Sequence, residues 1–137
     1  MQKIEHIGIA VKDLKISNPL FEKLLGTPCY KEEEVKSEGV KTSFFKTGPN
    51  KIELLEATNE DSPIAKFIEK KGEGVHHIAF AVDDIVSEIA RLKEEGFIVL
   101  NEKPKKGADN KLVAFLHPKS TNGVLIELCQ DIDKSKK

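Results

Sequence analysis

The sequence predicts an α+β fold in which two β-α-β-β-β modules follow one another in a single domain and form a cupped mixed sheet. Three observations predict this fold. Two motifs recur in the same order, strand and helix periodicities alternate in the same way in both halves, and 137 residues is the length of one domain.

Two short motifs carry the internal repeat. Residues 6–14 read His-Ile-Gly-Ile-Ala-Val-Lys-Asp-Leu, and residues 77–85 read His-Ile-Ala-Phe-Ala-Val-Asp-Asp-Ile. Residues 51–55, Lys-Ile-Glu-Leu-Leu, are matched in the same way by residues 125–129, Leu-Ile-Glu-Leu-Cys. The first motif recurs after 71 residues and the second after 74, so the two halves have the same internal order.

In both halves the first motif has strand periodicity and a helical pattern follows it. Large apolar residues alternate with histidine and small residues along residues 6–11 and 77–82. Gly26 and Gly96 are placed to end the two helices. The residues expected on the apolar helix faces are Ile16, Leu20 and Leu24 in the first helix and Ile85, Ile89 and Leu92 in the second.

Three short strands follow in each half, separated by glycine-containing turns. They are expected near residues 28–36, 40–47 and 51–57, and near residues 97–103, 111–117 and 123–130. Ser62 as an N-cap and Pro63 in the first turn predict a helix between the halves. The single domain, residues 1–137, is thus expected to consist of module one (about 1–57), a linker helix (about 58–72) and module two (about 73–131).

Composition excludes several classes of function. Twenty-two Lys and Arg residues balance 23 Asp and Glu residues, so the basic bias typical of nucleic-acid or anionic-membrane binding is absent. No apolar run approaches the ~20 residues of a membrane span, and the first residues lack the apolar core of a secretion signal. Cys29 and Cys129 do not form a disulfide framework, so a cytoplasmic protein with reduced thiols is expected.

The repeat gives four polar side chains a common setting. His6 and His77 project from strand faces otherwise made of small residues, and Glu53 and Glu127 lie between aliphatic residues. A carboxylate in an apolar strand costs free energy unless it is paired or coordinated. If a pseudo-twofold axis relates the halves, two imidazoles and two carboxylates meet, which suits a six-coordinate divalent cation with two open positions. A single strand histidine is more often a hydrogen-bonded core residue, but the recurrence of both residue types favours a metal site.

Three further features have weaker interpretations. His76 lies on the opposite strand face from His77 and is expected to be structural or to support a ligand. His117 belongs to a His-Pro-Lys turn and is expected to be a loop residue. The lysine-rich segment at residues 103–106 either meets an anionic substrate or is a solvated loop.

Five segments carry a resemblance to known proteins: residues 6–11, 51–56, 61–67 (Asp-Ser-Pro-Ile-Ala-Lys-Phe), 74–79 (Gly-Val-His-His-Ile-Ala) and 117–128 (His-Pro-Lys-Ser-Thr-Asn-Gly-Val-Leu-Ile-Glu-Leu). The first and fourth resemble the whole vicinal oxygen chelate superfamily, which includes glyoxalases, bleomycin resistance proteins and dioxygenases. The segment at 61–67, the histidine pair and the loop after His117 resemble the methylmalonyl-CoA epimerases more particularly. The resemblance extends from His6 to about Gln130.

The resemblance implies the glyoxalase-like fold, a cupped mixed sheet around a metal site whose ligands are His6, Glu53, His77 and Glu127. It implies a divalent ion, cobalt first, with nickel, manganese, magnesium or zinc as alternatives. It also implies a homodimer and an acyl-CoA thioester as substrate. The implied reaction interconverts the (R) and (S) forms of methylmalonyl-CoA by α-proton abstraction through a metal-stabilised enolate.

Inversion requires an acid/base group on each side of the reacting carbon. Glu127 is the first expected base. Family members with a second catalytic glutamate place it on the strand after a Glu-Gly-Val turn, which is residues 38–40 here, so the matching position is about Thr42. A threonine is no general base unaided, so either Glu53, Glu38 or a metal-bound water takes the second role, or the function differs from simple epimerisation.

Three other functions are less favoured by the residues. A glyoxalase I-type lyase (lactoylglutathione lyase) uses the same ligand types, although residues 62–65 and the His117 loop favour the epimerase. A non-catalytic small-molecule-binding member of the superfamily has no reason to keep all four ligands. An extradiol dioxygenase normally uses two histidines and one carboxylate, so a fourth protein ligand disfavours it.

Overall fold

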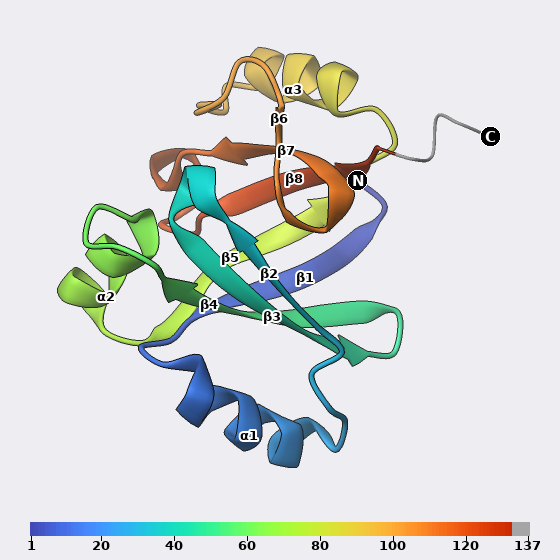
Figure 1. Cartoon of the computed structure of the whole chain (residues 1–137). Coiled ribbons are helices and arrows are strands. Elements are labelled where there is room, and N and C mark those ends of the chain that lie inside the picture. Colours follow the sequence, from blue (N-terminus) through green and yellow to red (C-terminus); the bar gives the residue numbers. More distant parts are fainter. Residues whose placement is uncertain (133–137) are drawn as a thin grey trace. The chain divides into compact units, whose positions relative to one another are not determined.

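A computed structural model describes residues 1–132 and confirms the two β-α-β-β-β runs (Figure 1). The first run is β1 (Lys3–Ala10), α1 (Leu14–Leu25), β2 (Lys31–Val35), β3 (Val40–Thr47) and β4 (Asn50–Ala57). Helix α2 (Pro63–Lys71) follows. The second run is β5 (Gly74–Ala81), α3 (Ile85–Glu94), β6 (Lys105–Lys106), β7 (Lys111–Leu116) and β8 (Ile126–Asp131).

The chain divides into two compact units. The N-terminal unit is His6–His76, and the C-terminal unit combines Met1–Glu5 with the described residues from His77 onward. In the N-terminal unit the strand order is β2-β3-β4-β1, with β1 parallel to β4 and the other pairs antiparallel. The C-terminal unit repeats this pattern as β6-β7-β8-β5, with β5 parallel to β8.

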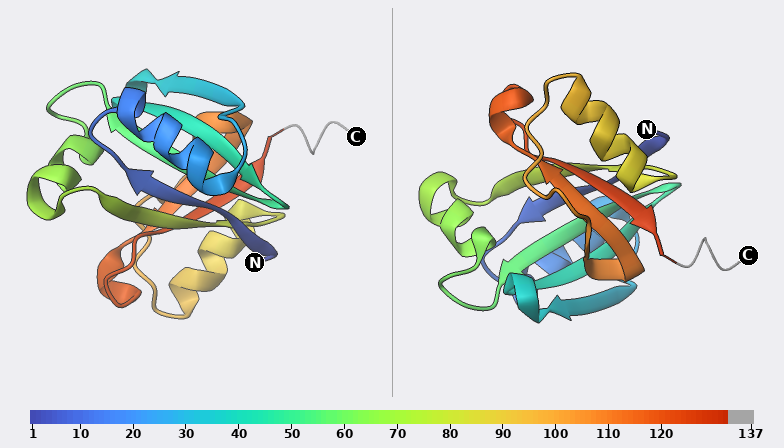
Figure 2. Two further views of the ribbon diagram at one scale, coloured as in Figure 1. Left: turned by 90° about the horizontal axis from the view of Figure 1, so that it is seen from below. Right: turned by 90° about the horizontal axis from the view of Figure 1, so that it is seen from above.

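Each unit packs a helix against one face of its sheet. Helix α1 contributes Leu14 to a cluster with Val11, Phe45 and Leu54. Helix α3 makes the matching cluster in the C-terminal unit, and Figure 2 shows it lying along β7 and β8. In the N-terminal unit the opposite sheet face is also covered, because Ile64 of α2 packs on Ala10, Val40 and Leu55.

The repeat extends to hydrogen bonds that no sequence motif reveals. The first residue of each module helix donates its backbone N–H to a side chain of the last strand, Leu14 to Glu56 Oε1 and Ile85 to Gln130 Oε1, both at 2.7 Å. These bonds satisfy a helix N–H that has no intrahelical partner. They also fix where each helix begins relative to its sheet.

The predicted core face of α1 is wrong, whereas that of α3 is confirmed. Ile16, Leu20 and Leu24 are 70%, 59% and 69% exposed, and the helix instead buries Leu14 and packs Phe21 against the sheet. Two apolar stripes run along this helix, and periodicity alone does not say which one faces the sheet. The stripe that contains Leu14 and Phe21 is the one that packs on the sheet.

The predicted strand at residues 97–103 is also wrong. Here only Val99 forms an isolated bridge, to Leu116, and the paired edge strand is the shorter β6. Asn101 accounts for the break, because its side-chain Oδ1 accepts the Phe115 N–H at 2.9 Å in place of a strand carbonyl. The strand expected at 123–130 begins at Ile126, after Gly123 with φ 85°. None of the helices in residues 1–132 has the length and apolar character needed to cross a membrane.

Candidate metal centre

The N-terminal unit holds a buried histidine–glutamate pair. The parallel register of β1 and β4 sets Gly8 beside Glu53, and His6 lies two residues earlier on the same strand face. Because the residue beside the glutamate has no side chain, the carboxylate can extend toward the imidazole. His6 Nδ1 lies 3.2 Å from Glu53 Oε2, and the two side chains are 5% and 7% exposed.

The C-terminal unit builds a second pair in the same way. The register of β5 and β8 sets Ala79 beside Glu127, and His77 lies two residues before Ala79. His77 Nε2 is 2.9 Å from Glu127 Oε1, and both side chains are buried. The two units therefore carry matching pairs, as the repeat in the sequence predicts. The small residues near each histidine make room for a glutamate, so those strand faces are occupied and buried.

The donor atoms of both pairs fit a divalent metal ion. Two adjacent ligands of an octahedral ion, bound at about 2.1 Å, lie about 3.0 Å apart. The N–O separations of 3.2 and 2.9 Å in the two pairs agree with that spacing. Imidazole and carboxylate are donors that cobalt, nickel, manganese and zinc accept, whereas neither pair includes a thiolate.

A phenylalanine lies directly opposite each glutamate. Phe44 on β3 is in register with Glu53, and Phe115 on β7 is in register with Glu127. The Phe115 and His77 rings are 6.0 Å apart and almost perpendicular. Neither phenylalanine is among the site residues expected from the sequence, although the repeat includes them: Phe115 follows Phe44 by the 71 residues that separate His77 from His6.

Comparison with known proteins identifies the family. The model of the glyoxalase/bleomycin resistance protein/dioxygenase superfamily matches residues 5–115. The chain belongs to this superfamily. The resemblance inferred from the motifs is confirmed, and so is the predicted fold class.

Several relatives of this chain are named methylmalonyl-CoA epimerases. The ethylmalonyl-CoA/methylmalonyl-CoA epimerase of Cereibacter sphaeroides is 45% identical over 131 residues, covering 93% of this chain and 97% of the relative. The human mitochondrial methylmalonyl-CoA epimerase is 40% identical over 129 residues, covering 93% and 73%. A solved structure of a methylmalonyl-CoA epimerase in complex with methylmalonyl-CoA and NH4+ matches with a TM-score of 0.92 at 36% identity, covering 96% of each chain.

The candidates for the second base occupy different places in this superfamily member. Thr42 is buried on β3 opposite Leu55, so it is a diagonal neighbour of Glu53 at about 7 Å. Glu38 ends a short 3-10 turn before β3. From Val40 to Phe44, which faces Glu53, the strand rises about 13 Å, so Glu38 is remote from the histidine–glutamate pair.

The remaining histidines have structural contacts. His76 packs its ring edge-on against Phe67 of α2, with 5.0 Å between ring centroids. His117 is the N-cap of a 3-10 turn, where its Nδ1 accepts the Lys119 N–H at 3.0 Å. Of the lysine-rich segment, Lys105 and Lys106 form edge strand β6, and contact with an anionic substrate stays a prediction.

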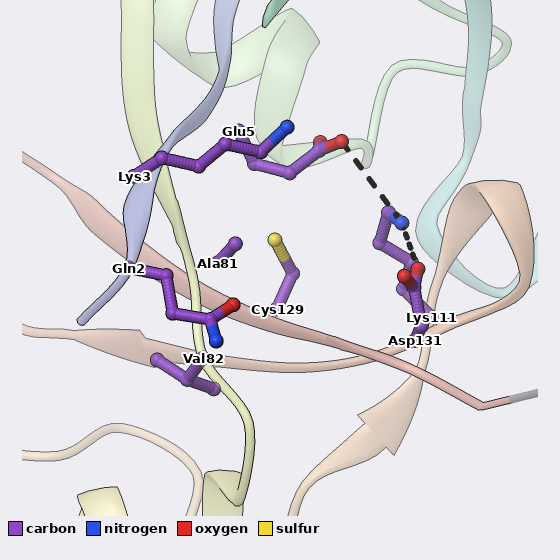
Figure 3. A pocket seen from close by; sticks show the side chains of 8 residues that line it. All are labelled: Gln2, Lys3, Glu5, Ala81, Val82, Lys111, Cys129 and Asp131. Carbon is purple, nitrogen blue, oxygen red and sulfur yellow. Dashed lines mark hydrogen bonds and ion pairs between the residues drawn. The ribbon is translucent and has the colours of Figure 1, made fainter. Parts of the chain in front are cut away.

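A cavity of about 110 Å³ opens in the C-terminal unit, on the strand face that carries Glu127 (Figure 3). It is lined by Gln2, Lys3, Glu5, Ala81, Val82, Lys111, Cys129 and Asp131. Lys111 Nζ is ion-paired with Asp131 and lies 3.9 Å from Glu5 Oε2. The repeat matches Ala81, Lys111 and Cys129 to the residues that α2 covers in the N-terminal unit, so a charged network replaces an apolar cluster here.

Proposed function

We propose that this chain is a metal-dependent epimerase that interconverts (R)- and (S)-methylmalonyl-CoA. The observation that carries the proposal is the matching buried histidine–glutamate pair in each unit, in a chain whose named relatives are methylmalonyl-CoA epimerases. His6, Glu53, His77 and Glu127 would together hold one divalent ion. Cobalt is the first candidate, with nickel, manganese, magnesium and zinc as alternatives.

The reaction requires proton transfer at a carbon that lies between a thioester and a carboxylate. The bound metal would act as a Lewis acid that stabilises negative charge on the thioester oxygen. Glu127, as the carboxylate, takes the α-proton from one face of the carbon, and Glu53, protonated at that moment, gives its proton to the other face, which inverts the centre and leaves the proton on Glu127. Glu53 is preferred to Glu38 because it belongs to a proposed ligand pair, whereas Glu38 lies in the turn before β3, remote from that pair.

The test is epimerisation of methylmalonyl-CoA by protein stripped with a chelator and then supplied with each metal in turn. We expect turnover with at least one divalent ion and none with the stripped protein. Ethylmalonyl-CoA and the methylglyoxal–glutathione hemithioacetal serve as comparison substrates. Inactivity on both acyl-CoA esters with every metal would refute the proposal, and turnover of the hemithioacetal alone would replace it with a glyoxalase-type function.

We propose that the chain acts as a homodimer through the apolar stripe of α1, defined as Ile16, Leu20 and Leu24. These three side chains follow one another at four-residue spacing, and Asp13 and Lys23 flank them on the helix. An antiparallel second copy would bury the stripe against itself and bring Asp13 near the partner's Lys23. The stripe is thus complementary to itself in both apolar surface and charge.

Leu20→Glu is expected to convert the dimer to a monomer, because it places two carboxylates inside an apolar contact. Sedimentation velocity measures the change. Val86→Glu is the matched control, since Val86 is 64% exposed on α3 and lies outside the stripe. A Leu20→Glu protein that sediments as a dimer would exclude this interface, and a monomeric wild type would exclude the dimer itself.

The domain organisation and location are part of the same proposal. Residues 1–137 act as one domain, with module one at about 1–57, the linker at about 58–72 and module two at about 73–131. The low cysteine content supports a cytoplasmic location, which cell fractionation would test.

A further inference from the structure

We infer that Phe115 is a positioning residue for the metal centre: its ring sets the orientation of the His77 imidazole. The inference rests on the proposed function, because it assigns a role toward the metal held by that pair. The contacts that support it all lie within the C-terminal unit.

The first support is the contact with the imidazole. The Phe115 and His77 rings are almost perpendicular, at 86°, with 6.0 Å between their centroids. Such edge-to-face contacts favour one relative orientation of the two rings. With the imidazole plane fixed by Phe115, its Nε2 stays directed at Glu127 Oε1, 2.9 Å away.

The second support is that both backbone polar groups of Phe115 are hydrogen-bonded to the segment at residues 100–101. Its N–H donates to Asn101 Oδ1 at 2.9 Å, and its carbonyl accepts the Leu100 N–H at 2.8 Å. The irregular segment around Asn101 thus fixes the strand position from which the ring projects. Groups that position a metal ligand must themselves be held in place, and these two bonds fix the backbone that carries the Phe115 ring.

The third support is the contrast with the matching residue of the other unit. Phe44 also faces a glutamate and also accepts a backbone N–H, from Tyr30, at 3.0 Å. Phe44 is fully buried and packs against the Tyr30 ring at 6.1 Å. Phe115 is only partly buried, and its ring contacts the imidazole of His77, a proposed metal ligand. Both phenylalanines therefore face a glutamate, but the Phe44 ring packs against Tyr30, whereas the Phe115 ring packs against the proposed ligand His77.

The test measures Co²⁺ affinity and the visible absorption of the Co²⁺-loaded protein, neither of which requires turnover. Phe115→Ala is expected to weaken Co²⁺ binding by about 10- to 100-fold and to shift the absorption bands, as loss of support around a ligand does elsewhere. Phe115→Tyr keeps the ring and should retain near wild-type affinity. Phe80→Ala is the matched control. Phe80 lies on the neighbouring strand β5, beside Leu128, and therefore on the opposite face of the sheet from Glu127.

The outcomes separate the inference from the proposed function. If wild-type protein binds Co²⁺ and folded Phe115→Ala binds it with equal affinity and an unchanged spectrum, the positioning role is overturned. If Phe115→Ala does not fold, a Phe115→Leu protein that binds like wild type overturns it as well. If wild-type protein itself binds none of the proposed metals, the proposed function fails before the inference is reached.

Discussion

Replacing Glu127 by glutamine is expected to lower the epimerisation rate about 1,000-fold. The change removes the proposed base and replaces a carboxylate ligand by an amide oxygen, which can still bind the metal, and general acid–base groups alone contribute about 10²- to 10⁴-fold. Glutamine keeps the side-chain size at a position that is buried on β8, so the fold is retained. The measurement is kcat for epimerisation, alongside exchange of the α-proton with D₂O for each epimer separately.

The exchange experiment also identifies the second base. If Glu127 and Glu53 act on opposite faces, each Gln variant loses inversion but still exchanges the proton of one epimer, and the two variants retain different epimers. Glu102→Gln is the control, because that carboxylate is 79% exposed and pairs with Lys93. Full exchange of both epimers in both Gln variants would remove the carboxylates from the mechanism.

Replacing Lys111 by methionine is expected to cost about 3 kcal/mol of unfolding free energy. Lys111 and Glu5 are both buried beside the cavity, and removing one member of a buried ion pair weakens the compensation of the other charge. Asp131 is 58% exposed, so water compensates it at little cost. Urea denaturation at neutral pH measures the difference from wild type.

Two companion variants make this prediction specific. Lys93→Met removes an exposed ion pair and should change stability by less than about 0.5 kcal/mol. The double variant Lys111→Met with Glu5→Gln removes the buried charge as well and should recover part of the loss. A double variant as unstable as the sum of the two single changes would show that Lys111 and Glu5 are energetically independent.

Much of the fold and of the candidate site follows from patterns that are local in sequence. The alternation around His6 and His77 and the glutamates inside apolar strands predicted four side chains that the structure sets in two buried pairs. The repeat was decisive. A single buried histidine or glutamate is usually structural, but the recurrence of both residue types at matching positions favours a metal site. The buried face was predicted correctly for α3 and wrongly for α1. Helix α3 has one apolar stripe, whereas α1 has two, and only contact with the sheet selects between them.

The error in the strand at residues 97–103 has another cause, which is that a side chain distant in sequence replaces a backbone pairing. Residues 97–103 have the composition of a strand but do not form one. The Asn101 side chain accepts the hydrogen bond from the Phe115 N–H, which a backbone carbonyl would accept in a regular strand pair. The facing of Phe115 and Glu127 depends on the register of β7 and β8. No local pattern encodes that register.

By itself, the sequence determined the order of elements, the two-module organisation and the residue types of the candidate metal centre, because periodicity and repetition are properties of neighbouring residues along the chain. The tertiary structure alone decided which α1 stripe is buried, how Lys111 and Glu5 share a cavity, and which aromatic ring faces each glutamate. Those outcomes depend on strand register and side-chain packing, where small differences in contact between distant residues select one arrangement among several that the same pattern allows.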